Sequence, residues 1–199
     1  MKKLIFITVM SIILGLWGCS TTLKATKLND KGYFPTSSKI AADGIKVEEP
    51  FNPKYRALLY VKTDEKSEEY NDFFIQSFKN MHIYDDVLGK EEIENLVFDR
   101  GLADTVTSVS DKIGLHNLYK HIGNFLVVEP TTFFKGGYDY SAELKTIDPE
   151  TGKIVLLIEN EAFNFAGLDK PLFYPLFNAF LEWSQGKPIS TRVKTESEK

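Results

Sequence analysis

Apolar and polar positions after residue 54 form short blocks that switch between the period of a strand and the period of a helix. Residues 55–62 (YRALLYVK) form a short apolar run between Pro53 and Asp64, which predicts a buried strand. The next apolar residues recur at three- and four-residue spacings, which predicts one face of a helix over about residues 65–80. These residues are Tyr70, Phe73, Phe74, Phe78 and Met81.

The middle of the chain predicts one more short strand and two helices. Residues 82–88 (HIYDDVL) predict the strand, which Gly89 ends, and residues 90–98 predict a short helix. A partial apolar face predicts a longer helix over about residues 103–122, with a break near Gly114.

Three apolar segments in the second half of the chain predict strands of one sheet. Residues 124–129 (NFLVVE) are almost continuously apolar, which suits a central strand covered on both faces. Residues 138–146 alternate between apolar and polar positions, and residues 153–163 return as a second strand after a turn at 148–152. Residues 131–137 (TTFFKGG) are either a loop or an extension of the preceding strand.

The last apolar segment predicts a helix that Gly186 ends. Pro171 and Pro175 suit its first turn, and its apolar stripe continues to Trp183. Residues 187–199 are polar and charged, which predicts a disordered tail.

These elements predict one α/β domain over residues 55–186. It would be built on a single mixed sheet of about five strands with helices mainly on one face. Residues 19–54 begin polar and predict a tether, whose second half docks partly on the domain through scattered apolar residues. If residues 20–54 were flexible throughout, the tether would reach about 30–35 Å.

The amino terminus has the pattern of a secretory signal. Lys2 and Lys3 precede an apolar run over residues 4–16. Because a membrane-spanning helix needs roughly 20 apolar residues, this run predicts a signal peptide over residues 1–18 that is removed. The alternatives are an ordinary signal peptide followed by a free cysteine, and an uncleaved anchor.

The end of this run, Leu16-Trp17-Gly18-Cys19, resembles the lipobox of bacterial lipoprotein precursors. Leu16 supplies the apolar position of the cleavage site, and Gly18 supplies the small residue. The resemblance implies that Cys19 takes a diacylglyceryl group and that acyl chains such as palmitate anchor the mature chain. Because Ser20 follows the cysteine in place of Asp, the resemblance also implies an outer-membrane anchor that faces the periplasm.

Charge and cysteine content exclude several partners. The chain has a net charge of −4, and losing Lys2 and Lys3 with the signal peptide lowers it to −6. An acidic chain without a basic run is unsuited to neutralise phosphates, so no nucleic-acid partner is expected. Lipidation of Cys19, the only cysteine, would leave no thiol for a disulfide.

No set of side chains has the spacing that a catalytic or metal site requires. His116 and His121 lie five residues apart, which is not the i, i+4 spacing of a zinc site, and His82 is distant in sequence. Asp85 and Asp86 are adjacent on a predicted strand and would point to opposite faces, so they cannot act on one bond. The chain is therefore expected to bind no metal or cofactor and not to be an enzyme.

Two groups of aromatic residues are candidates for binding a partner. Phe133, Phe134 and Tyr138 flank a glycine pair, and exposed aromatics of this kind suit a partner's pocket. The alternative is that both phenylalanines lie beneath the sheet. Tyr174 and Trp183 lie off the main stripe of the last helix, and the alternative for them is partial burial at the helix edges.

Three segments carry a family resemblance: residues 57–61 (ALLYV), 124–128 (NFLVV) and 142–155 (AELKTIDPETGKIV). They resemble a group of envelope proteins with an anticodon-binding-like α/β fold. The group includes the amino-terminal domain of the Tol-system periplasmic protein, the curli secretion lipoprotein and lipoprotein activators of penicillin-binding proteins. The resemblance implies this fold, and no functional residue is carried over from the group.

Together these features predict a non-enzymatic, membrane-anchored lipoprotein that binds another protein of the cell envelope. The first alternative is a subunit of an oligomeric envelope secretion or transport assembly, which the resemblance to the curli lipoprotein suggests. The second is a cell-wall or lipid hydrolase, because envelope lipoproteins include such enzymes.

Overall fold

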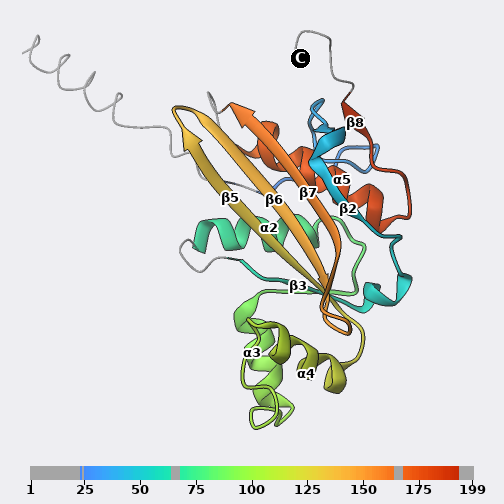
Figure 1. Ribbon diagram of the computed structural model, residues 1–199, viewed down its shortest axis with the longest axis vertical. Helices are drawn as coiled ribbons and strands as arrows, with labels where there is room; N and C mark the ends of the chain where they lie inside the picture. Colours follow the sequence, from blue (N-terminus) through green and yellow to red (C-terminus); the bar gives the residue numbers. More distant parts are fainter. Residues whose placement is uncertain (1–22, 24, 64–67, 164–167, 193–199) are drawn as a thin grey trace, which may run out of the picture.

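The computed structural model describes residues 23, 25–63, 68–163 and 168–192, and its main element is a six-stranded mixed sheet (Figure 1). The strands are β2 Ile45–Glu48, β3 Leu58–Val61, β4 Asp86–Leu88, β5 Leu126–Gly136, β6 Asp139–Asp148 and β7 Lys153–Phe163. Their order is β2-β7-β6-β5-β3-β4, with β3 parallel to β4 and β5 and the other neighbours antiparallel. The predicted mixed α/β class is confirmed, with six strands rather than about five.

Helices cover both faces of the sheet where β3 pairs with β5. The helices are α2 Glu68–Lys79, α3 Lys90–Asp99, α4 Lys112–Ile122 and α5 Tyr174–Ser184. α2 and α5 share a hydrophobic cluster with Leu126 and Val128, whereas α3 and α4 share a second cluster with Val127, on the opposite face of the same strand. The prediction of helices mainly on one face therefore holds for α2 and α5 but not for α3 and α4.

Aromatic rings dominate the larger of the two clusters, which lies between the sheet, α2 and α5. The ring centroids of Phe73, Phe74 and Phe78 on α2 lie 5.6, 6.0 and 5.5 Å from that of Phe177 on α5. The predicted helical stripe is therefore confirmed over α2. The part of the predicted helix that precedes Glu68 lies outside the described residues.

The predicted helix over residues 103–122 is wrong in its first half. The carboxylate of Asp111 accepts hydrogen bonds from the backbone N–H groups of Ile113 and Gly114, at 3.0 and 2.9 Å. This cap starts α4, because it satisfies N–H groups that have no partner within the helix. The preceding residues form turns, and their valine side chains are nevertheless buried in the second cluster.

Two predicted strands are shorter in the structure. The segment 55–62 begins in a 3-10 turn over Pro53–Ala57, and only its second half forms β3. The segment 82–88 contributes only the three residues of β4. His82 has a φ of 53°, which lies outside the extended region and prevents the strand from starting there.

Residues 25–54 belong to the domain instead of forming a tether. Phe34 is fully buried, and its backbone N–H and C=O both bond to the side-chain amide of Asn178, at 2.8 and 3.1 Å. β2 extends the main sheet by pairing with β7. Because these residues fill core space and complete the sheet, the predicted docking of the second half is confirmed. The predicted tether and the domain boundary at residue 55 are wrong for the described residues.

The ends of the chain are described only in part. β8 (Thr191–Arg192) pairs in parallel with β1 (Ile40–Ala41), so the predicted disordered tail over residues 187–199 is wrong as far as Arg192. Residues 193–199 and residues 1–22, which include the predicted cleavage site and Cys19, lie outside the described residues. Within the described ranges, every helix is too short or too polar to cross a membrane.

Candidate functional site

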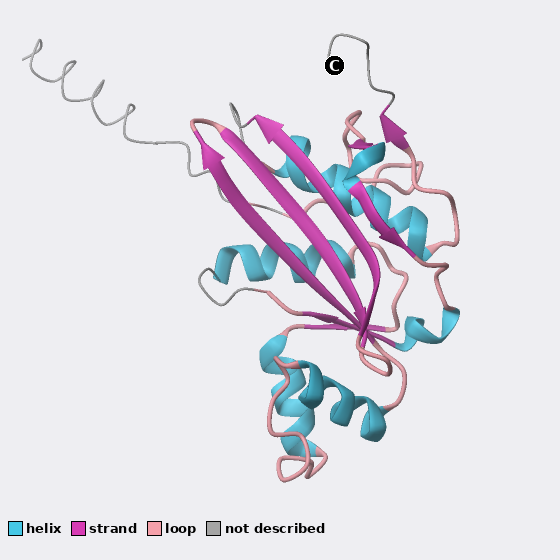
Figure 2. Cartoon of the chain, viewed as in Figure 1, coloured by secondary structure: helices cyan, strands magenta, loops and turns pink. Residues whose placement is uncertain are grey.

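Three strands reach the same end of the sheet, where β5 and β6 form a long hairpin (Figure 2). β5 continues to Gly136, so residues 131–137 extend the strand and are not a separate loop. The last residue of β7, Phe163, lies opposite Asp139, the first residue of β6. β3 pairs with β5 only as far as Val128, so the hairpin extends well beyond β3.

Four aromatic side chains, called the tip aromatics below, are exposed at this end of the sheet. Phe133, Phe134 and Tyr138 are 50%, 65% and 59% exposed, and Phe163, which the sequence analysis missed, is 57% exposed. The ring of Phe134 lies 5.3 Å from that of Tyr140, and the rings of Tyr138 and Phe163 are 5.7 Å apart. Burial of both phenylalanines beneath the sheet is therefore wrong, while their binding to a partner stays a prediction.

Two glycines set the turn that presents these rings. Gly136 and Gly137 have φ values of 106° and 63°, in the region that favours glycine. A Cβ atom at Gly137 would have no other atom within 4 Å, so backbone conformation rather than space selects glycine there.

The charges beside the tip aromatics nearly cancel. The ammonium group of Lys135 on β5 forms an ion pair with the carboxylate of Glu161 on β7. Asp139 is exposed beside them. These three side chains therefore leave about one negative charge at this end of the sheet.

An ion-pair network lies farther along the hairpin, near the end of β3. Glu129 on β5 is 13% exposed, and its carboxylate contacts Lys62 Nζ at 2.6 Å and also pairs with Lys145. Burial alone would raise the pKa of Glu129. The hydrogen bonds from Lys145 and Lys62 outweigh burial and hold this pKa below its usual range.

The two other predicted contact residues, Tyr174 and Trp183, are buried and cannot meet a partner in this fold. Each is 2% exposed. Trp183 Nε1 donates to the carbonyl of Glu49 at 2.6 Å, and the Tyr174 ring lies 5.4 Å from that of Phe34. Burial, with a smaller effect of a nearby carboxylate, raises the pKa of Tyr174 to about 12. The prediction is wrong because Phe34, Glu49 and Phe51 contact these two side chains of α5.

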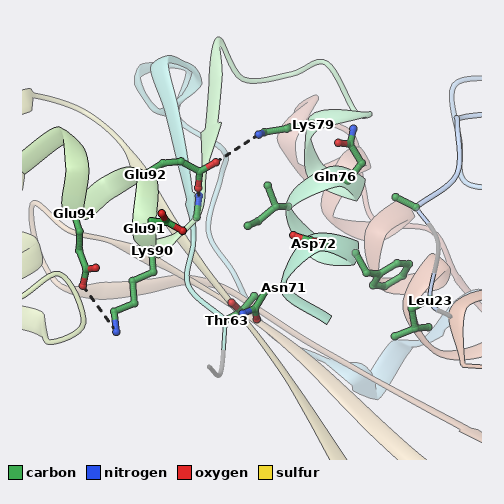
Figure 3. A pocket seen from close by; sticks show the side chains of 14 residues that line it. Leu23, Thr63, Asn71, Asp72, Gln76, Lys79, Lys90, Glu91, Glu92 and Glu94 are labelled. Carbon is green, nitrogen blue, oxygen red and sulfur yellow. Dashed lines mark hydrogen bonds and ion pairs between the residues drawn. The ribbon is translucent and has the colours of Figure 1, made fainter. Parts of the chain in front are cut away.

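A wide cleft with a volume of about 1130 Å³ lies between α2 and α3 (Figure 3). On its wall, Glu92 Oε2 accepts the backbone N–H of Gly89 at 2.7 Å, and Glu92 Oε1 lies 3.9 Å from Lys79 Nζ. Lys90 and Glu94 form a second ion pair, at 3.9 Å. These charged groups cap α3 and pair with each other, and the described lining contains no histidine that could act as a base for a nucleophile.

The other candidates for chemistry are not brought together. His116 Nδ1 lies 3.2 Å from the carbonyl oxygen of Pro149, and Asp85 and Asp86 are both exposed. The described residues contain no group of three or more histidine, cysteine or acidic side chains that could hold a metal ion. That the chain is not an enzyme stays a prediction.

Comparison with known proteins gives a weak result. No family model and no curated protein matches the chain. The C-terminal domain of LpoB from Salmonella enterica is similar, with 11% identity, coverage of 56% of this chain and 85% of that one, and a TM-score of 0.35. Lipoprotein GNA1162 from Neisseria meningitidis has 17% identity, coverage of 53% and 81%, and a TM-score of 0.34. The PelC dodecamer from Paraburkholderia phytofirmans has 11% identity, coverage of 71% and 95%, and a TM-score of 0.35.

Proposed function

We propose that this chain is a lipid-anchored protein of the bacterial cell envelope that acts as an interaction module for a second envelope protein. Its anchor is Cys19, which the lipobox pattern predicts to be lipidated and freed by cleavage after Gly18. Ser20 favours the outer membrane, with the module facing the periplasm. The module works without a metal or cofactor and catalyses no reaction.

The observation that carries this proposal is the position of Leu23, four residues after the proposed anchor. Its backbone N–H donates to Glu69 Oε1 at 2.7 Å, and its side chain packs against the larger hydrophobic cluster. A fully extended chain spans at most about 14 Å between Cys19 and Leu23. The anchor would therefore hold the module directly at the membrane surface, and not about 30–35 Å away on a flexible tether.

A module held at this distance meets those partners that reach the same membrane surface. Anchoring both proteins to one surface raises their effective concentration, so a modest intrinsic affinity is enough for stable pairing. The partner is therefore expected to be a membrane or membrane-associated envelope protein, and its capture should depend on the anchor.

The test is a pull-down of the tagged chain from detergent-solubilised native membranes, with Cys19→Ala as the control. Bound proteins and the amino-terminal peptide are identified by mass spectrometry. The expected result is one stoichiometric envelope protein, lost or weakened in the control, together with an acylated Cys19.

Other outcomes would contradict the proposal. An unmodified Cys19 would contradict the proposed lipid anchor. Recovery of the chain alone as a monomer would contradict the proposed protein partner. Recovery of the chain alone in a large particle would favour a subunit of an oligomeric assembly instead.

A further inference from the structure

We propose that the tip aromatics lie in the interfacial layer of the membrane that holds the anchor, and so give the module a second, non-covalent contact with lipid. This inference rests on the proposed function in one respect, since it takes Cys19 as the point where the chain meets the membrane. The surface that the tip aromatics contact is then a zwitterionic lipid surface and not a protein.

The arrangement of the rings favours lipid over a protein surface. Phe133 and Phe134 are neighbours on a strand, so their side chains point to opposite faces of the hairpin, and both are at least half exposed. Tyr138 and Phe163 add exposed rings from the turn and from β7. A flat protein surface would contact one face of the hairpin, whereas an interfacial lipid layer surrounds its end and contacts both.

The described contacts connect the tip of the hairpin to the part of the domain that holds Leu23. Glu69, which accepts the N–H of Leu23, precedes Tyr70 at the start of α2. Tyr70 and Tyr140, which comes from β6, both pack against the larger hydrophobic cluster. Tyr140 in turn contacts Phe134, with ring centroids 5.3 Å apart. In Figure 1 the turn between β5 and β6 and the start of α2 both lie on the left side of the molecule.

The chemistry of the tip suits the headgroup region of a bilayer. Tyrosine is enriched in this region, and amphipathic helices bury faces that contain phenylalanine in it to a depth of about 5–10 Å. Lys135 and Glu161 neutralise each other, which leaves Asp139 as the unbalanced charge. The tip therefore offers no net positive charge to acidic lipids, and contact should need only zwitterionic ones.

A second exposed apolar region supplies a control. Phe98 on α3 is 70% exposed, close to the 65% of Phe134. In Figure 1, α3 and α4 lie at the bottom of the molecule, remote from the turn between β5 and β6. If exposure alone determined lipid contact, both Phe98 and Phe134 would contact lipid. If position relative to the anchor determines it, only Phe134 contacts lipid.

The experiment fixes the chain to vesicles at the proposed anchor by chemistry. In the mature chain, residues 19–199, the thiol of Cys19 is the only one, and it adds across the double bond of a maleimide carried by a phospholipid. The vesicles are phosphatidylcholine, with or without bromine atoms on the acyl chains that quench tryptophan fluorescence. The variants are Phe134→Trp and Phe98→Trp, and the parent chain reports the background from Trp183, which is 2% exposed.

The expected result is a roughly twofold loss of the fluorescence added by Phe134→Trp in brominated vesicles, with no loss for Phe98→Trp or the parent chain. Equal quenching of both variants, or quenching of neither, would overturn the proposal. So would an emission shift of Phe134→Trp that appears only when solubilised native membrane proteins are added, because that result would assign the tip to a protein partner. The chemical link keeps this result separate from the pull-down, since the cell's own lipidation of Cys19 does not affect it.

Discussion

The chain contains two Phe-Phe pairs, and the structure places them in opposite surroundings. Phe73 and Phe74 lie in α2 and are 1% and 3% exposed, whereas Phe133 and Phe134 lie in β5 and are 50% and 65% exposed. The first pair packs among rings of α5 and the segment before it. The second pair lies near the turn of the hairpin, beyond the part of β5 that is enclosed between the two hydrophobic clusters.

The geometry of the two elements explains the difference. Neighbouring residues on a helix are about 100° apart, so a wide apolar stripe can include both. Neighbouring residues on a strand point to opposite faces, so both are buried only where both faces are covered. Val127 and Val128, on the same strand as the exposed pair, are both fully buried because one hydrophobic cluster lies on each side. Position along β5, and not residue type, therefore decides which side chains face solvent.

The largest effect is expected from Phe73→Ala. The Phe73 ring lies 5.4 Å from Phe173 and 5.6 Å from Phe177, in a cluster that cannot collapse easily around a cavity. The free energy of unfolding should fall by about 3–5 kcal/mol. Urea unfolding followed by circular dichroism measures this as a lower midpoint at an unchanged slope. A loss below about 1 kcal/mol would mean that the α2 stripe is not core.

A smaller effect is expected from Glu129→Gln, where β5 passes the end of β3. The change leaves Lys62 and Lys145 without their shared carboxylate. The free energy of unfolding should therefore fall by about 1–3 kcal/mol at neutral pH. Glu143→Gln is a control on the same face of the sheet. Burial, and to a smaller extent the charge of Glu159, raises the pKa of Glu143. Replacing its carboxylate with a neutral amide should therefore not lower the free energy of unfolding.

The effect of Glu129→Gln should also depend on pH. The pKa of Glu129 is lower in the folded state than its usual 4.5, so its ion pairs stabilise the fold fully above the unfolded pKa. This stability is lost as pH falls through the lower, folded pKa. The midpoints of wild type and Glu129→Gln should therefore converge as pH falls below 4.5 and through the folded pKa. A difference between the two midpoints that stays constant with pH would contradict the electrostatic origin of the effect.

Next in size is Gly137→Ala, which tests whether the turn alone holds the exposed pair in place. Alanine at a φ of 63° should lower the free energy of unfolding by about 1 kcal/mol, although the added methyl group has no other atom within 4 Å. Gly137→Asn should cost less, because asparagine tolerates this region of φ better than alanine. A larger loss for Gly137→Asn than for Gly137→Ala in urea unfolding would mean that space, rather than backbone conformation, restricts this position.

Local patterns predicted the parts of the fold that depend on local periodicity. The alternation along residues 138–146 and the return over residues 153–163 gave β6 and β7, and the aromatic stripe gave α2. The same pattern misled at residues 103–111, where valines at a three-residue spacing belong to buried turns. There the carboxylate of Asp111 decides the helix start. Phe163 was within reach of prediction, since the register of the hairpin places it opposite Asp139.

Contacts between distant segments could not be predicted in this way. The position of Tyr174 and Trp183 off the apolar stripe of α5 makes them candidate contact residues, with partial burial as the alternative. They are buried because Phe34 and Phe51, more than 100 residues earlier, pack against them. A helix that is apolar around almost its whole circumference indicates burial on all sides, and α5 has this composition. The burial of α5 can therefore be predicted from its own sequence, but the segment that covers it cannot.

The smallest effect is expected from Phe134→Ala, which removes the same atoms as Phe73→Ala. Its ring is 65% exposed and contacts Tyr140, so the free energy of unfolding should change by no more than about 0.5 kcal/mol. Urea unfolding of both variants under one buffer makes the comparison direct. A loss near that of Phe73→Ala would show that the hairpin end is part of the core and would leave its exposure unexplained. If Phe134→Ala leaves stability unchanged while Phe73→Ala causes a large loss, folding does not require an aromatic ring at the tip. The role of that ring must then lie in what the tip contacts.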